Sequence, residues 1–207
     1  MTFINLKIAQ CTAQTSDLSF VPALLRRRLS ANIKASLTAA HLLCPDAQDI
    51  ATVYASRFGE WRTTTAQLEL EYAENRVSAA SFGLSVHNAG IGLWHLISQN
   101  HRPYTSIAAG LHSFDLGLLE ALSILTKNQG RVLYIYSDES RPELYAQIFP
   151  DFAPLTIGAL IEPGADFAVE LGNFSAAPAA PLALVELAAS KQPELTAPFY
   201  RIVRAGC

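Results

Sequence analysis

The segment that begins at Gly110 is apolar around most of the circumference of the helix that its spacing predicts. Its apolar positions are Leu111, Phe114, Leu118, Leu119, Leu122 and Leu125. A helix that is apolar on nearly all sides belongs inside a fold, so we expect it to be enclosed. Predicted strands lie on either side of it, at Tyr104 to Ala109 and at Val132 to Tyr136. This order indicates an α/β protein in which helices pack on a sheet.

The rest of the chain continues the alternation of strands and helices. The other predicted elements are a strand at Phe3 to Ala9, a helix from Pro22 to about Cys44, a strand at Ile50 to Phe58, helices at Thr63 to Tyr72 and Phe82 to Asn100, a hairpin of Leu155 to Ile161 with Phe167 to Leu171 across Pro163-Gly164, a short helix at Leu182 to Ala189, and a terminal segment at Phe199 to Val203. We predict one domain over residues 1–174 and an Ala/Pro-rich linker with a C-terminal extension over residues 175–207.

Composition limits the classes of function. A chain of 207 residues that is 50% hydrophobic can bury a sizeable core, and its net charge of -3 gives no electrostatic reason to expect nucleic acid. Cys11, Cys44 and Cys207 are far apart and form no C-x-x-C pair, so we expect neither a disulfide framework nor a zinc site. The first residues, interrupted by Lys7, resemble neither a signal peptide nor a membrane span. We therefore expect a cytoplasmic protein without a membrane span.

Histidines and serines near residue 90 suggest two kinds of site, and the spacing disfavours both. Ser85 and His87 have the separation of a nucleophile elbow, but residues two apart on a helix face different directions. His87, His95 and His101 share no helical stripe with an acidic residue, so satisfied or exposed histidines are favoured over a metal site. We predict no metal and no cofactor.

Two carboxylates interrupt the apolar helix after Gly110. Asp115 and Glu120 are five residues apart and lie on somewhat different faces of that helix. A buried carboxylate is costly without partners, and a polar contact between subunits is one explanation. The alternative is that both side chains point to a solvated edge, and the sequence leaves both interpretations open.

Two motifs resemble the N-terminal half of β-ketoacyl synthases. They are Ser85-Val86-His87-Asn88-Ala89-Gly90-Ile91-Gly92 and Thr105-Ser106-Ile107-Ala108-Ala109-Gly110-Leu111-His112-Ser113-Phe114. In that family an Asn-containing helix precedes a strand that leads into a Cys-Ala-Ser-Gly turn and a buried helix. Asn88 and Gly92 match the first part, and placing Gly110 on the glycine of the turn puts Ile107 at the nucleophile position. The similarity covers about residues 20 to 162 and extends to short, chain-length-factor-like proteins of type II fatty acid, polyketide and aryl polyene systems.

The resemblance implies a thiolase-like layered fold, N-terminal half only, and a chain without catalytic residues. Decarboxylative condensation needs a thiolate and histidines. Ile107 supplies neither, and His112 lies too close to the turn to be one of the family's histidines. The chain is then expected to form a heterodimer with a complete β-ketoacyl synthase, stabilising it and bounding its acyl tunnel, and to meet an acyl carrier protein only indirectly. The alternatives are a free-standing acyl-binding or acyltransfer enzyme with another nucleophile and, less favoured, a homodimeric scaffold.

The same resemblance gives candidate positions for the tunnel and the interface. They are Ser81, Phe82, Asn88, Ile107 and Phe114. The segment Ala79 to Phe82 falls where condensing-enzyme dimers insert a residue of one subunit into the other's acyl channel, and Phe82 is its bulkiest side chain. The surface of Tyr104 to Phe114 is expected to be apolar and covered by the partner subunit.

Overall fold

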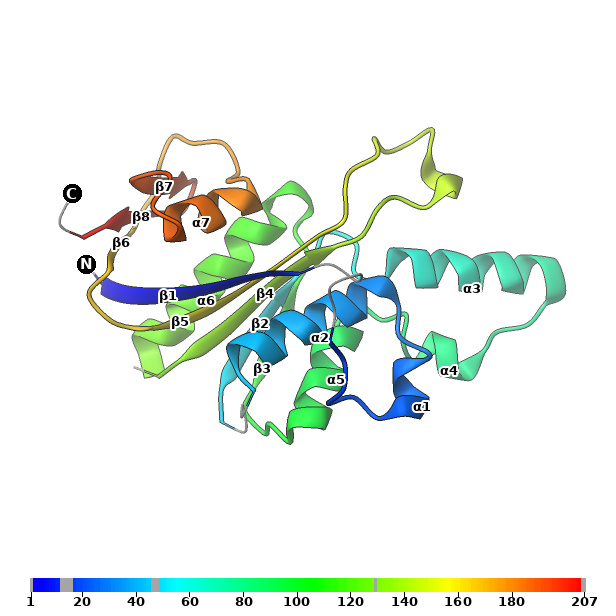
Figure 1. Ribbon diagram of the computed structural model, residues 1–207. Helices are drawn as coiled ribbons and strands as arrows, with labels where there is room; N and C mark the ends of the chain where they lie inside the picture. The colour runs from blue at the N-terminus through cyan, green and yellow to red at the C-terminus, as the bar shows by residue number, and fades with distance from the viewer. Residues whose placement is uncertain (1, 12–16, 46–48, 129, 206–207) are drawn as a thin grey trace.

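In the computed structural model, which describes residues 2–11, 17–45, 49–128 and 130–205, the chain forms an eight-stranded sheet with helices on both faces (Figure 1). The strands are β1 (Thr2–Cys11), β2 (Ala51–Ala55), β3 (Tyr104–Ile107), β4 (Val132–Asp138), β5 (Leu155–Pro163), β6 (Phe167–Leu171), β7 (Glu194–Ala197) and β8 (Tyr200–Arg204). The helical segments are α1 (Ala23–Arg26), α2 (Ala31–Leu43), α3 (Trp61–Glu74), α4 (Ala79–Phe82), α5 (Ala89–Ser98), η2 (Gly110–His112), α6 (Ser113–Asn128), η3 (Glu143–Tyr145) and α7 (Pro181–Ala188). The predicted α/β class is confirmed.

The sheet has the strand order β3-β2-β4-β5-β1-β6-β8-β7. Strands β2, β3 and β4 run parallel, and the other neighbouring strands are antiparallel. Helices α2 and α5 cover one face, where Leu37 and Trp94 are buried. Helices α6 and α7 cover the other face, where Leu122 and Leu187 are buried. The hydrophobic core is therefore divided into two layers by the sheet.

Helix α6 lies close against the sheet, as its apolar sequence predicts. Its side chains Phe114, Leu118 and Leu122 are buried. A β-carbon on Gly117 would lie 2.6 Å from the β-carbon of Ala55 and 2.8 Å from the Tyr134 ring, so only glycine allows this approach. The prediction that this helix is enclosed within the fold is confirmed, except that Leu111 in the preceding η2 turn is exposed.

Two of the predicted helices differ from the structure at their N-terminal ends. The first breaks after Arg26, and a new helix begins where the Ser30 hydroxyl accepts a hydrogen bond from the Ile33 amide at 3.0 Å. The second, predicted from Phe82, begins at Ala89 as α5, and the Ser85 hydroxyl in the segment before it donates to the Phe82 carbonyl at 2.8 Å. Short polar side chains offer the backbone a local alternative to a continuous helix, which apolar spacing alone does not reveal.

The predicted hairpin of β5 with β6 is wrong. Strand β1 lies between them and pairs antiparallel with both. The Asn5 carboxamide of β1 accepts hydrogen bonds from the Ala165 and Asp166 amides at 3.0 and 3.2 Å, and the Gly164 amide donates to the Phe3 carbonyl. The turn at Pro163-Gly164 therefore wraps around the end of β1, because pairing with the chain's first strand replaces pairing across the turn.

The C-terminal segment joins the same sheet. Helix α7 buries Leu184 and Leu187, and β8 pairs with β6. Asp115 of α6 is fully buried and accepts hydrogen bonds from the Ala179 amide and the Tyr200 hydroxyl, each at 3.2 Å. The partners of this carboxylate thus come from its own chain, and neither a subunit contact nor a solvated edge is needed to explain it. The division at residue 174 stays a prediction.

Candidate functional site

The carboxyl ends of β2, β3 and β4 lie together at one end of the sheet, which is where α/β proteins commonly place their sites. Asp138, which ends β4, is buried there and accepts four hydrogen bonds. The Arg57 amide and the Ser56 hydroxyl donate to its Oδ1 at 2.8 and 2.9 Å. The Tyr136 hydroxyl donates to its Oδ2 at 2.6 Å, and the Arg57 guanidinium pairs with the same oxygen. This network fixes the loop after β2 against the end of β4.

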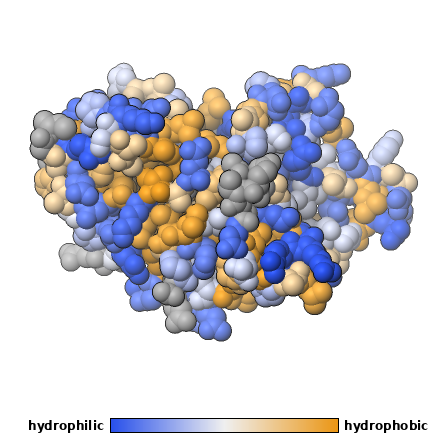
Figure 2. All heavy atoms as spheres, in the orientation of Figure 1, coloured by the Kyte–Doolittle hydropathy of each residue, from blue (hydrophilic) through white to orange (hydrophobic). Residues whose placement is uncertain are grey.

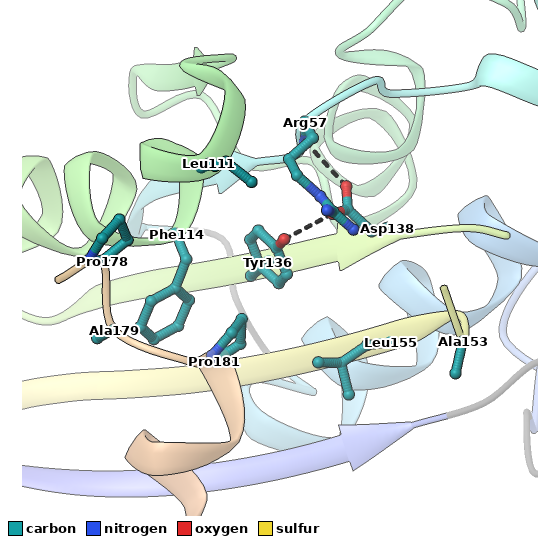
Figure 3. Close-up of a pocket in the computed structure, with 10 residues that line it drawn as sticks. All are labelled: Arg57, Leu111, Phe114, Tyr136, Asp138, Ala153, Leu155, Pro178, Ala179 and Pro181. Atoms are coloured by element: carbon teal, nitrogen blue, oxygen red, sulfur yellow. Dashed lines mark hydrogen bonds and ion pairs between the residues drawn. The ribbon is translucent and has the colours of Figure 1, made fainter. Parts of the chain in front are cut away.

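A cavity of about 360 Å³ opens beside this network (Figure 3). It is lined by Arg57, Leu111, Phe114, Tyr136, Asp138, Ala153, Leu155, Pro178, Ala179 and Pro181. Arg57 and Asp138 form its polar end, and the strap of residues 178–181 lies across one side. Its size and mostly apolar lining are those of a small-molecule pocket with a few orienting polar groups. The cavity can hold a ligand that has an apolar part along the walls and an oxygen atom directed at the Arg57 guanidinium.

Ile107 is the last residue of β3 and lies just before the turn that starts α6. It packs against the core on the α6 side, and Gly110 of the turn has a φ of +57°. The aliphatic side chain can neither attack a thioester nor transfer a proton. Cys11 and Cys44 are buried in the other core layer, where burial raises the pKa of both thiols, that of Cys44 to about 11. Cys207 lies outside the described residues.

The structure does not gather the other candidates into one pocket. Phe114 lines the cavity but is buried in the chain's own core, so it contributes no exposed surface. Ser81 lines a different cavity, between α3 and η3, and the neighbouring Phe82 ring is 60% exposed. Asn88 lies at the start of α5 and donates to the Tyr104 hydroxyl at 3.2 Å. Their proposed roles at a tunnel or interface stay predictions.

The histidines near residue 90 are held by hydrogen bonds. His95 contacts the Thr52 hydroxyl and the Asn100 carbonyl at 3.0 and 3.2 Å. His87 lies 3.0 Å from both the Ser106 hydroxyl and the Ser56 carbonyl, and it makes no hydrogen bond with Ser85. In the described part of the chain, no three metal-ligating side chains lie together. Sequence reasoning missed the pairing of His87 with Ser106 because it depends on how the segment before α5 packs against β3.

A second feature that the sequence did not predict lies at the root of helix α3. Glu60 and Glu139 are both buried there. Glu139 accepts a hydrogen bond from the Arg62 amide at 2.6 Å, and Glu60 accepts from the Asn32 carboxamide at 3.0 Å. Burial raises the pKa of Glu139 to about 7 and raises the pKa of Glu60. These carboxylates hold the start of α3, where the buried residues of that helix, Trp61 and Thr65, lie.

Two segments project from the end of the sheet at which β2 and β4 have their carboxyl ends (Figure 1). One is the α3–α4 arm, residues 61–82, and the other is the 139–154 loop. Their exposed apolar side chains are Leu68, Tyr72, Val77, Phe82, Leu144, Ile148 and Phe149. Figure 2 shows hydrophobic residues on the projecting arm among hydrophilic ones. Apolar surface of this kind is a common mark of protein–protein contact.

Strand β3 is the edge strand on this side of the sheet. Among the described strands it pairs only with β2, so its outer backbone groups lack a partner strand. Tyr104 on this strand and Leu96 on α5 are exposed. No helix among the described residues combines the length and hydrophobicity that crossing a bilayer requires.

Comparison with known proteins gives a family and several structural neighbours. The family profile described as β-ketoacyl synthase, N-terminal domain, matches residues 5–197, further in both directions than the predicted 20–162. A chain in the solved complex of the ketosynthase ApeO with its chain length factor ApeC from Xenorhabdus doucetiae aligns with a TM-score of 0.77 at 19% identity, covering 99% of this chain and 100% of that chain.

Other solved structures are similar over a part of their length. The ishigamide ketosynthase/chain length factor has a TM-score of 0.55 at 16% identity, covering 70% of this chain and 49% of that chain. The AntDE–AntF complex, a type II polyketide acyl-carrier protein with its ketosynthase, has a TM-score of 0.58 at 12% identity, covering 75% and 56%. No curated protein sequence matches significantly. The predicted thiolase-like layered fold, N-terminal half only, is confirmed.

Proposed function

Because the chain belongs to the β-ketoacyl synthase N-terminal domain family, we propose that it is a non-catalytic, chain-length-factor-like partner of a complete β-ketoacyl synthase. The observation that carries this proposal is Ile107 at the end of β3, where the family resemblance expects the nucleophile. Without a thiolate at that turn the chain cannot hold the growing acyl group as a thioester. Condensation is then left to the partner.

The comparison with the ApeO–ApeC complex supports a partner role. The chain aligned in that complex is covered completely, whereas the aligned chains of the ishigamide and AntDE–AntF structures are covered over 49% and 56% of their length. A complete synthase subunit would supply the histidines that decarboxylation requires.

We place the contact with the synthase at the β3 edge. Unpaired backbone groups on an edge strand readily accept a strand of another chain. Exposed apolar side chains flank this edge, among them Tyr104, Leu96 and Leu111. A stable heterodimer needs about 1,200–2,000 Å² of buried surface in total, so the α3–α4 arm is expected to contribute as well.

Phe82 is the proposed gate of the partner's acyl tunnel. Phe82 is 60% exposed and lies on α4, a single turn of helix that forms the last residues of the α3–α4 arm. A ring this exposed contributes little to the core, so its loss is expected to cost far less than the roughly 3–5 kcal/mol of a buried phenylalanine. The exposure favours a role toward a partner over a role in packing.

The test is co-expression with a complete synthase encoded nearby, followed by size-exclusion chromatography and product analysis. We expect a heterodimer that condenses acyl groups, and a Phe82→Ala complex of the same size that makes longer products. Leu68→Ala, which shortens another exposed side chain on the same arm, is the matched control for product length. A chain that stays monomeric beside an active synthase would contradict the partner role, and unchanged products in an intact Phe82→Ala complex would contradict the gate.

The second candidate function is acyl binding without a synthase. The cavity beside Arg57 favours it, because the guanidinium has donors beyond the one it gives to Asp138 and the walls are apolar. Binding of a medium-chain fatty acid to the isolated chain, lost in Leu155→Trp, would support this function. It would not by itself exclude the heterodimer.

A further inference from the structure

Ser106 and His87 form a hydrogen-bonded pair that the proposed partner role does not use. The Ser106 hydroxyl oxygen lies 3.0 Å from Nδ1 of His87. Nε2 of the same ring lies 3.0 Å from the backbone carbonyl oxygen of Ser56. The pair belongs to the α5 side of the sheet, since His87 packs edge-on against Tyr54 of that core layer.

The Ser56 carbonyl decides which nitrogen of His87 carries the proton. A carbonyl oxygen can only accept, so Nε2 must be the protonated nitrogen for this hydrogen bond to exist. In the neutral ring Nδ1 is then an unprotonated acceptor, and the Ser106 hydroxyl must be the donor. A serine hydroxyl that donates to an imidazole held by a third group is the arrangement of an activated nucleophile and its general base.

The imidazole is held in place from several sides. A β-carbon on Gly59 would lie 2.8 Å from the Cα atom of His87, so the loop after β2 closes directly on this residue. The Tyr54 ring centroid lies 5.6 Å from that of His87. Both His87 and Ser106 nevertheless remain partly exposed. The base is therefore oriented in advance, and the pair is not sealed inside the core.

We propose that Ser106 is a nucleophile that accepts an acyl group from a thioester or activated ester, with His87 as its general base. The Ser106 oxygen attacks the acyl carbonyl while its proton passes to Nδ1 of His87. The bond from the carbonyl carbon to the leaving thiolate, or to the phenolate of an activated ester, breaks, and His87 returns the proton to that leaving group. The products are a serine ester and a free thiol or phenol. This activity goes beyond the partner role, in which the chain itself forms no covalent bond with an acyl group.

The experiment uses the isolated full-length chain with p-nitrophenyl butyrate and with butyryl-CoA. Intact-protein mass spectrometry is expected to show one butyryl group, and peptide mapping is expected to place it on Ser106. Ser106→Ala should abolish the adduct, and His87→Gln should slow its formation by roughly 10²–10⁴-fold. Ser85→Ala is the matched control, because that hydroxyl donates to a backbone carbonyl and should not affect the rate.

A Ser106→Cys variant gives a second readout that does not depend on acyl transfer. A thiol beside the His87 imidazole should be alkylated by iodoacetamide faster than the same thiol in a Ser106→Cys, His87→Gln double variant. Circular dichroism confirms that each variant is folded. Absence of a butyryl adduct, an adduct elsewhere in the chain, or equal alkylation of the two cysteine variants would each overturn the proposal. None of these results depends on a synthase, so the partner role is tested separately.

Discussion

Replacing Glu139 by glutamine removes a buried negative charge at the root of helix α3 and keeps an oxygen that can accept from the Arg62 amide. The carboxyl is 6% exposed, and burial raises its pKa from the ordinary 4.5 to about 7, with the nearby Glu60 and Asp138 acting in the same direction. Between these two pH values the folded protein binds a proton that the unfolded chain has released. Stability from this group is therefore present below about pH 4.5 and is lost as the pH rises through about 7.

The size of the effect follows from the two pKa values. A shift of this extent corresponds to about 3 kcal/mol of unfolding free energy. Glutamine does not titrate, so the Glu139→Gln variant should gain up to about 3 kcal/mol relative to the natural protein between about pH 5 and pH 8. Glu60 is present in both proteins, so most of its own titration cancels in the comparison. Urea denaturation at a series of pH values measures the difference.

Glu143→Gln is the matched control for this experiment. Its carboxyl is exposed on the neighbouring η3 segment, so the variant should follow the pH dependence of the natural protein. If Glu139→Gln keeps the same slope of stability against pH as the natural protein, the carboxyl is not buried as the structure describes it, and the reasoning fails.

Three further predictions concern the turn and helix after β3. Ile107→Cys should leave the isolated chain without condensing activity, measured as decarboxylation of malonyl carrier protein, because the turn would gain a thiol but no histidine. Gly117→Ala should destabilise the chain by about 1–3 kcal/mol through its 2.6 Å approach to Ala55, whereas Gly83→Ala, with its nearest neighbour at 3.6 Å, should change little. Asp115→Ala should cost about 1–3 kcal/mol and expose residues 175–181 to protease, and Glu120→Ala should not.

The parts of the fold that the sequence predicts correctly are those with a strong local pattern. Helix α6 is apolar over most of its surface, and β4 begins with the apolar run Val132 to Tyr136, so each can be predicted from its own residues alone. The hairpin of β5 and β6 fails because its competitor, β1, lies more than a hundred residues earlier in the chain. The break before α2 has a local cause, the cap at Ser30, but the apolar spacing of leucines across it suggests one continuous helix.

The same distinction between local patterns and contacts made by folding applies to the candidate site. The turn at Gly110 and the position of Ile107 follow from a motif that is contiguous in the sequence. The buried pair Glu60 and Glu139 comes from the ends of two elements, and nothing in either segment alone indicates burial. Its physical origin is the packing of the first turn of α3 against the end of β4, which only the folded chain brings about.

The pleat of β3 places Ile107 and Ser106 on opposite faces of the sheet. Successive residues of a strand point to opposite faces, so Ile107 packs on the α6 side whereas Ser106 meets His87 on the α5 side. An acyl group held next to Ile107 therefore could not reach Ser106 without crossing the sheet. Loss of the thiol on one face and activation of a hydroxyl on the other are independent properties. A nucleophile introduced at position 107 should consequently leave the butyrylation of Ser106 unchanged, whereas a partner strand on the β3 edge should affect access to both.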